Sequence, residues 1–220
     1  MSNTAKQVWV YIRKDWSLDW RKKFSLGGIF LYIITCTFIV FLSFKEISPE
    51  AWNALFWIIL LFGVVNGVVR SFQQESSNQK LYFFQLVDPY VVLFAKILYN
   101  FMMTCLMAIL TFSMLSIFSA MPVEDFLSFI LIILAGSLAL SICFTFISSI
   151  ATQAQQSTTL MAILGLPIII PIMLLLVKLT RNSLGLVLEP EYGTDFMILG
   201  AISVILFALS LWLFPIIWKE

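Results

Sequence analysis

The chain has no histidine, few charged residues and only three cysteines, and these absences exclude several kinds of chemistry. Histidine is the commonest general base and metal ligand, so no site centred on it can form. The chain also lacks a Walker-type phosphate loop, paired acids within an apolar run, and a nucleophile next to a base. The sequence therefore predicts no catalytic residues and no metal site, and any ATP hydrolysis must take place in a partner.

The three cysteines do not form a redox or disulfide pattern. Cys36, Cys105 and Cys143 lie far apart in the sequence, each inside an apolar run. Neither a CxxC pair nor a disulfide framework is available at such spacings. We expect all three to be small buried hydrophobic residues.

Charged residues make up only 11% of the 220 residues, whereas 61% are hydrophobic. An average soluble domain has about 25% charged residues, so this composition is that of an integral membrane protein. The charges are nearly balanced, with 13 Lys and Arg against 12 Asp and Glu. No nucleic-acid partner is expected.

Long apolar runs recur along the chain, and a bilayer core about 30 Å thick needs about 20 apolar residues in a helix. Six runs fit this template: 26–44, 51–69, 92–120, 126–151, 160–179 and 196–218. Helices are required because lipid offers no hydrogen-bond partner to the backbone. The sequence predicts an all-α polytopic membrane protein in which residues 26–220 form a six-span domain.

The positive charges are distributed unevenly between the two sides that six spans would define. One side carries ten: Lys6, Arg13, Lys14, Arg21, Lys22, Lys23, Arg70, Lys80, Lys96 and Lys219. The other carries three: Lys45, Lys178 and Arg181. Lys and Arg concentrate on the cytoplasmic side of membrane proteins, so both termini are predicted to be cytoplasmic.

The first 25 residues are predicted to form an amphipathic helix at the membrane interface. Val8, Trp9, Ile12, Trp16 and Trp20 fall near helical spacing, and basic residues lie between them. Tryptophan prefers the headgroup level, and basic side chains can reach anionic lipids. Such a helix could be a simple lipid anchor or could add a docking surface.

Few polar or small residues interrupt the spans. Gly63 and Gly67 form a GxxxG step around Asn66, which favours close helix packing over substrate binding, and Asn66 could hydrogen-bond across the contact. Pro167 and Pro171 are four residues apart in the fifth run and predict a bent helix. The bend could serve transport or only packing.

The connection between the second and third runs, residues 71–91, begins polar, turns apolar and aromatic, and ends on an Asp-Pro pair. Such an amphipathic segment can lie flat at the membrane surface. We expect it to be a cytoplasmic coupling helix that receives a push from a soluble partner; the alternative is an ordinary interfacial loop, since aromatic residues favour that depth. The predicted coupling residues are Glu75, Asn78, Leu81, Tyr82, Phe83, Phe84, Asp88 and Pro89.

The same loop carries a resemblance to a known family. Glu75, Ser77-Asn78, the apolar run 81–87, Pro89 and Ala95-Lys96 resemble the permeases of ABC-2-type exporters. The chain is similar, more narrowly, to the family of cytochrome c maturation protein B, also called haem exporter protein B. Its length, its basic N-terminus and the stretch LGLPIIIPIMLLL, with its Leu-Pro-x-x-x-Pro pattern, support this.

The resemblance implies a bacterial inner-membrane permease that works with a P-loop ATPase subunit and a haem-handling membrane subunit. It implies no directly bound cofactor: ATP is bound by the partner, and haem is a transported or handed-over ligand. Two other functions stay open at this point. The chain could be the permease of an ABC-2 exporter for lipid, glycan or drug, or a membrane scaffold that transports nothing.

Overall fold

The computed structural model describes residues 8–13, 16, 23–44, 46–73, 88–119, 121–151, 157–188 and 191–217. Throughout these ranges the regular structure is helical, without strands. Residues 8–13 form a short helical segment. The long helices are α2 (Lys23–Ser43), α3 (Pro49–Gln73), α5 (Pro89–Phe118), α6 (Phe126–Ala151), α7 (Ser157–Ser183) and α8 (Gly193–Ile217).

The long helices start and stop at residues whose chemistry suits helix ends. The Ser48 hydroxyl accepts a bond from the backbone N–H of Ala51 at 3.3 Å and so caps α3. Asp125 caps α6 in the same way, through the N–H of Ser128 at 3.1 Å. Beyond α7, Gly185 has a φ of +66°, the left-handed conformation that closes many helices and that glycine adopts without strain.

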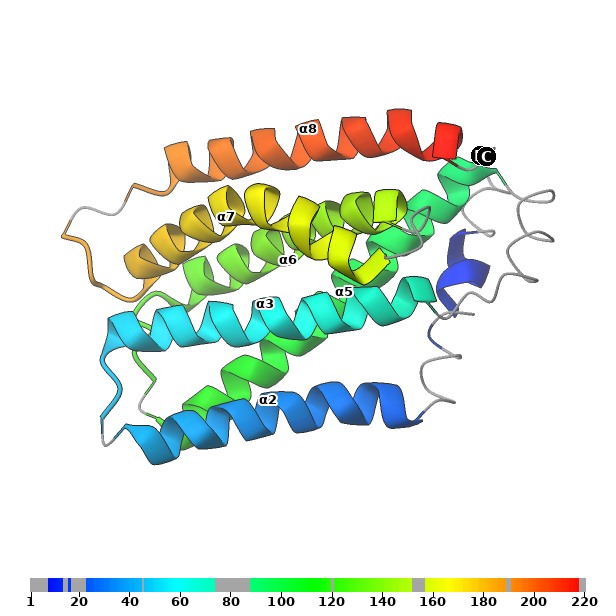
Figure 1. The fold of residues 1–220 in the computed structure, drawn as a ribbon. Helices are drawn as coiled ribbons and strands as arrows, with labels where there is room; N and C mark the ends of the chain where they lie inside the picture. The colour runs from blue at the N-terminus through cyan, green and yellow to red at the C-terminus, as the bar shows by residue number, and fades with distance from the viewer. Residues whose placement is uncertain are drawn as a thin grey trace.

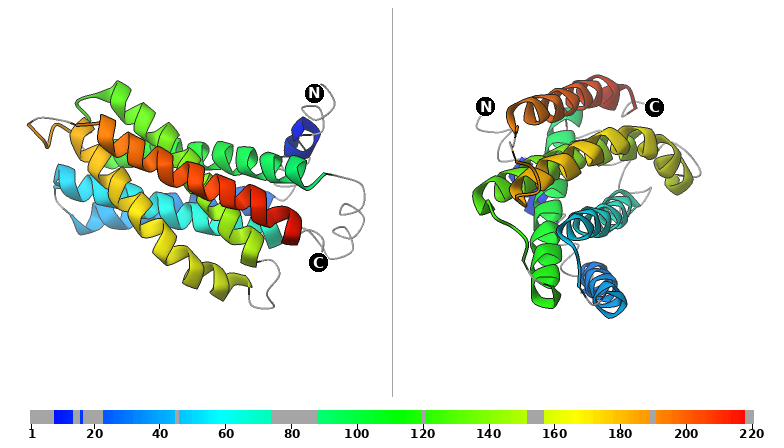
Figure 2. Two further views of the ribbon diagram at one scale, coloured as in Figure 1. Left: turned by 90° about the horizontal axis from the view of Figure 1, so that it is seen from above. Right: turned by 90° about the vertical axis from the view of Figure 1, so that its left-hand side faces the viewer.

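The long helices run alternately up and down in one bundle (Figure 1). Segment 8–13, the starts of α2, α5 and α7, and the ends of α3, α6 and α8 lie at one end. We call this the N-terminal end of the bundle. The two further views show α5 running obliquely past its neighbours (Figure 2). Every predicted apolar run therefore corresponds to one helix. The starts and ends of the helices alternate between the two ends of the bundle, as the sequence predicted.

Five of the described helices, α3, α5, α6, α7 and α8, are long and apolar enough to cross a membrane. The all-α polytopic class predicted from the sequence is confirmed. In α2 the described apolar stretch is Gly27–Ser43, which the same criterion does not count among the five. A span at α2 is therefore not established by the same criterion.

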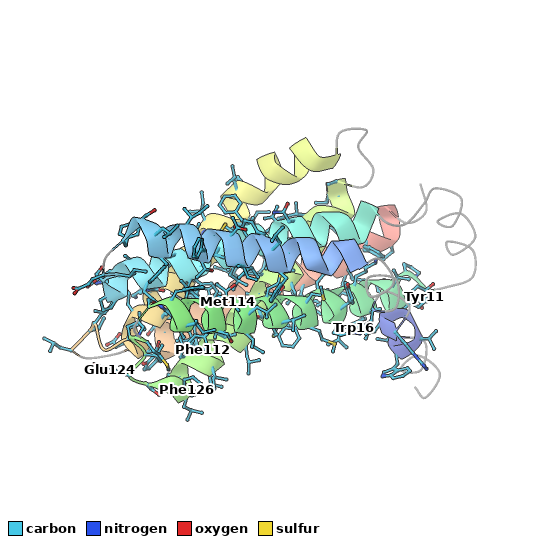
Figure 3. The ribbon with its side chains drawn as sticks, turned by 90° about the horizontal axis from the view of Figure 1, so that it is seen from below. Tyr11, Trp16, Phe112, Met114, Glu124 and Phe126 are labelled. Carbon is cyan, nitrogen blue, oxygen red and sulfur yellow. The ribbon has the colours of Figure 1, made fainter. Side chains whose placement is uncertain are left out.

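The core is richest in aromatic rings near the end of the bundle opposite to segment 8–13. The Trp52 and Phe56 rings of α3 are stacked at 5.6 Å, and Phe56 lies 5.7 Å from Phe129 of α6. Phe112 of α5 packs 5.2 Å from Phe129. Figure 3 shows Phe112 toward this end and Tyr11 at the other. These contacts join α3, α5 and α6 into one packed unit.

Candidate functional site

The first turn of α5 holds the two predicted coupling residues that the structure describes. Asp88 is the N-cap, with its carboxylate accepting a bond from the N–H of Tyr90 at 3.0 Å. Pro89 occupies the first helical position, where a missing N–H costs nothing. Asp88 is exposed, so its cap lies at the surface of the N-terminal end.

The other predicted coupling residues lie outside the described residues: Glu75, Asn78, Leu81, Tyr82, Phe83 and Phe84. Their role stays a prediction. What the structure adds is the position of the two described residues that follow them. Asp88 and Pro89 are joined directly to the first turn of a long, packed helix.

From that turn, α5 runs through the bundle and contacts most of the other long helices. It packs against α2, α3, α6 and α8, four of the other long helices. Val91, Val92 and Leu93 are buried immediately after the cap, so the helix is held by packing from its first turns. The first turn of α5 therefore belongs to a helix that is in contact with these four neighbours.

A buried polar seam joins α5 to α6 below this turn. Asn100 of α5 is 2% exposed, and its amide donates to the hydroxyl of Thr145 at 2.9 Å. Lys96, one turn earlier, is also 2% exposed. The facing surface of α6 carries further buried small polar residues: Ser137, Ser141, Ser148 and Ser149. Lys96 and Asn100 therefore place an ammonium group and an amide group inside the apolar bundle.

The sequence analysis did not identify Asn100, Thr145 or the burial of Lys96. Two signals could have revealed them. Asn100 interrupts a long apolar run, and Ser137, Ser141 and Thr145 recur every four residues, which places them on one helix face. In a membrane helix such a face usually packs against protein, since a polar stripe in contact with lipid is unfavourable.

Gly63 and Gly67 lie where α3 meets α2 and α5. A Cβ added at Gly67 would stand 2.7 Å from Met107 Cε and 3.8 Å from Ile29 Cδ1. The lack of a side chain thus permits the close approach. Asn66 does not bond across this contact as the sequence suggested. Its amide donates to the Phe62 carbonyl of its own helix at 2.8 Å, because Asn66 is exposed and lies off the contact face.

Pro167 and Pro171 lie inside α7, and Figures 1 and 2 show that this helix changes direction along its length. Beyond the prolines α7 is tied to α3. The Asn53 amide donates to the Val177 carbonyl at 2.9 Å, and the Trp57 indole N–H donates to the Thr180 hydroxyl at 2.9 Å. The role of the bend in transport stays a prediction.

The end opposite to segment 8–13 holds an ion pair that was not predicted. Lys178 of α7 lies 2.8 Å from the Asp195 carboxylate in the first turn of α8. The Asp195 side chain is 3% exposed, whereas that of Lys178 is 66% exposed. This pair joins the first turn of α8 to α7. The sequence analysis placed Lys178 on this side but did not identify its partner.

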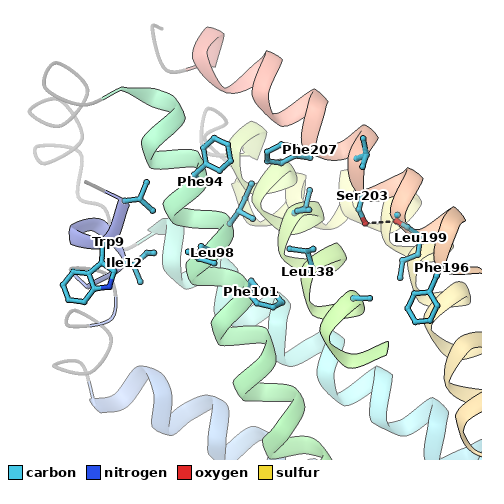
Figure 4. Close-up of a pocket in the computed structure, with 16 residues that line it drawn as sticks. Trp9, Ile12, Phe94, Leu98, Phe101, Leu138, Phe196, Leu199, Ser203 and Phe207 are labelled. Atoms are coloured by element: carbon cyan, nitrogen blue, oxygen red, sulfur yellow. Dashed lines mark hydrogen bonds between the residues drawn. The ribbon is translucent and has the colours of Figure 1, made fainter. Parts of the chain in front are cut away.

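An apolar groove of about 890 Å³ opens on the flank of the bundle. Its walls are α5 and α8, its floor is α6, and segment 8–13 lies at one end (Figure 4). Phe94 and Phe207 meet across it with ring centroids 5.6 Å apart. The sequence predicted no groove, because its lining comes from four separate stretches.

Comparison with known proteins gives one match. No curated protein and no solved structure matches the chain. A family model described as CcmB protein matches residues 6–216, which includes every helix described above except the last residue of α8. Since this match covers nearly the whole chain, the protein belongs to the CcmB family, as its resemblance to cytochrome c maturation protein B indicated.

Proposed function

We propose that this chain couples ATP hydrolysis in a separate P-loop subunit to the delivery of haem, or of a haem-loaded chaperone, outside the inner membrane. The family match over residues 6–216 carries the proposal. Members of the CcmB family are permease subunits of the haem-export ABC transporter of cytochrome c maturation. In the proposal the chain holds no resident cofactor, ATP binds the partner, haem is the cargo, and a haem-handling membrane subunit completes the complex.

The proposal counts six spans by including α2. This helix has 21 residues, which at 1.5 Å per residue is about 31 Å, the thickness of a bilayer core. It packs against α3 and α5 and lies alongside them in the bundle. Phe30, Leu31 and Leu42 are exposed on it, as expected for a surface in lipid.

The proposal places the N-terminal end of the bundle in the cytoplasm. The support is the uneven distribution of Lys and Arg, ten on that side and three on the other. Gly193, at the start of α8, is exposed on the opposite end. A cysteine at this position should react with a membrane-impermeant thiol reagent in intact cells, provided that the native cysteines are replaced. Reaction only after the inner membrane is opened would reverse the orientation.

The coupling step of the proposal uses the connection between α3 and α5. A partner that pushes on this connection moves the first turn of α5, which Asp88 and Pro89 form. Because α5 contacts four other helices, the motion reaches most of the bundle. The buried seam around Asn100 and Thr145 then lies on the moving contact between α5 and α6.

The test is retention of the ATPase subunit by the full chain after extraction in a mild detergent. The double change Phe83→Ser and Phe84→Ser should release the ATPase, while the amount of inserted chain stays normal because the spans are untouched. The matched control is Val187→Ser with Leu188→Ser, which alters two exposed apolar residues of the connection at the opposite end.

Full retention of the ATPase by the Phe83/Phe84 variant, with normal cytochrome c maturation, would remove the coupling assignment. If the unchanged chain retains no ATPase at all, the scaffold alternative replaces the permease. If the unchanged chain retains an ATPase, but loss of the chain leaves cytochrome c maturation unaffected, the function of another ABC-2 exporter replaces the haem-related function.

A further inference from the structure

We infer that the groove between α5 and α8 is a binding site for one anionic phospholipid, whose acyl chains fill it and whose headgroup lies beside Arg13. The inference requires only that the bundle is in a membrane and does not depend on the proposed coupling. It begins from the position of segment 8–13. Figure 2 shows this segment running across α5 rather than along it, at the N-terminal end of the bundle.

The groove suits acyl chains by its chemistry and its size. Phe101, Leu138 and Val204 are typical of its lining, in which Ser203 carries the one hydroxyl. That hydroxyl donates to the Leu199 carbonyl of its own helix at 2.8 Å, so its hydrogen is not available to a ligand (Figure 4). A volume of 890 Å³ holds about thirty groups of the size of water or methylene, at about 30 Å³ each. Two phospholipid acyl chains are of this size.

The charge at the end of the groove selects the headgroup. The guanidinium of Arg13 lies 5.5 Å from the centroid of the Trp9 ring, and Trp9 lines the groove. Tryptophan and arginine together at the headgroup level are a common arrangement for anionic lipids. Of the described acidic residues, Asp88 lies at this end, and its carboxylate is engaged in capping α5. The described charge next to the groove is therefore positive.

A transmembrane helix of a partner fits the groove less well. Such a helix must cross the full bilayer core of about 30 Å. Val8, Trp9 and Ile12 line the groove at one end, where a partner helix would have to pass them to reach water. A phospholipid has no such difficulty, since its chains end within the membrane and its headgroup stops at the level of segment 8–13.

Gly200 offers a way to fill the groove without disturbing the fold. It lines the groove on α8, and a Cβ added there would meet no atom within 4 Å. Gly193, on the same helix but outside the groove lining, is equally open to a Cβ. Gly200→Phe and Gly193→Phe therefore form a matched pair. Arg13→Gln has its own control in Arg181→Gln, an exposed arginine at the opposite end of the bundle.

The experiment is native mass spectrometry of the full chain in detergent, with equal amounts of phosphatidylglycerol and phosphatidylcholine added. We expect the unchanged chain to retain one lipid, with phosphatidylglycerol preferred. Arg13→Gln should lower that preference about fivefold, which is the usual effect of one basic side chain near an anionic lipid. Gly200→Phe should reduce retention of both lipids at least fivefold, and the two controls should retain lipid normally. Thermal unfolding of each variant checks that the fold is unchanged.

Equal retention of the two lipids by the unchanged chain would overturn the inference. So would unchanged lipid retention in a folded Gly200→Phe variant, because the lipid would then be bound elsewhere on the apolar surface. If Gly200→Phe instead releases a co-purifying protein or a second copy of the chain, the groove is a protein interface and not a lipid site.

Discussion

Helices α6 and α8 are both strongly apolar, yet they occupy opposite environments. In their most apolar parts, 72% of α6 is buried inside the bundle but only 17% of α8 is. The difference lies in small and polar residues. α6 carries Gly136, Ser141 and Thr145 on its packed face, whereas α8 exposes Met197, Val204 and Trp212. In a membrane protein, therefore, small polar residues mark the protein-facing helix better than apolarity does.

The largest expected effect comes from placing a bulky residue at one glycine in each of the two helices. A Cβ at Gly136 would stand 2.8 Å from Leu176 and 2.9 Å from Trp57, and Trp57 is fully buried. Gly136→Leu should therefore lower the free energy of unfolding by about 2–3 kcal/mol. Gly200→Leu should change it little, since its Cβ meets open space. Thermal unfolding in detergent measures both, and equal losses would show that α8 is packed as tightly as α6.

The next test removes the ion pair that attaches α8. Lys178→Met leaves the Asp195 carboxylate, which is 3% exposed, without its cation. We expect a loss of about 2 kcal/mol, below the value for a fully buried pair because Lys178 itself is exposed. Adding Asp195→Asn should recover most of the loss. A single variant as stable as the original chain would mean that α8 is held by packing alone.

A smaller effect is expected at the seam between α5 and α6. Thr145→Val keeps the shape of the side chain but removes the acceptor for the Asn100 amide. Hydrogen bonds between membrane helices contribute about 1 kcal/mol, so the loss should be of that size. Ser203→Ala on α8 is the control, since its hydroxyl bonds only within its own helix. Unfolding in detergent, followed by the fluorescence of the tryptophans, compares the two changes.

The smallest effect concerns how α6 begins. The hydroxyl of Ser128, with the Ser128 N–H, holds the pKa of the Asp125 carboxyl below its ordinary value of 3.8. The stability that this carboxylate adds is present above pH 3.8 and is lost as the pH falls through the lowered pKa. Asp125→Asn keeps a capping side chain. It should remove this part of the acid dependence. Unfolding curves of the variant and of the unchanged chain, measured between neutral and acid pH, should therefore converge at low pH.

The fold was largely predictable because lipid leaves the backbone few choices. Every apolar run became a helix, and the differences are at the ends. Residues 51–69 extend to Pro49–Gln73, since Ser48 and Pro49 make a good helix start. Residues 160–179 extend to Ser157–Ser183, where Gly185 ends the helix. Length and apolarity fix the existence of a span, but its ends depend on local caps.

The candidate site was predictable only in part. Asp88 and Pro89 could be identified because an Asp-Pro pair before an apolar run is a local helix-start signal. The contact between Asn100 and Thr145 joins residues 45 positions apart, and the link between Trp57 and Thr180 joins residues 123 apart. Apolar periodicity does not specify which helix faces which, so pairings of this kind need the three-dimensional structure.

The length of α5 has a consequence for the membrane around the protein. Its 30 residues extend about 45 Å, well beyond a hydrocarbon core of about 30 Å, and the helix runs obliquely through the bundle. A helix that exceeds the bilayer adapts by tilting, so bilayer thickness acts on its inclination. Asp88 and Pro89 lie at the N-terminal end of this inclined helix. We therefore expect thinning or thickening of the bilayer to displace the turn that Asp88 and Pro89 form, which would make the lipid composition of the membrane a second input to the proposed coupling.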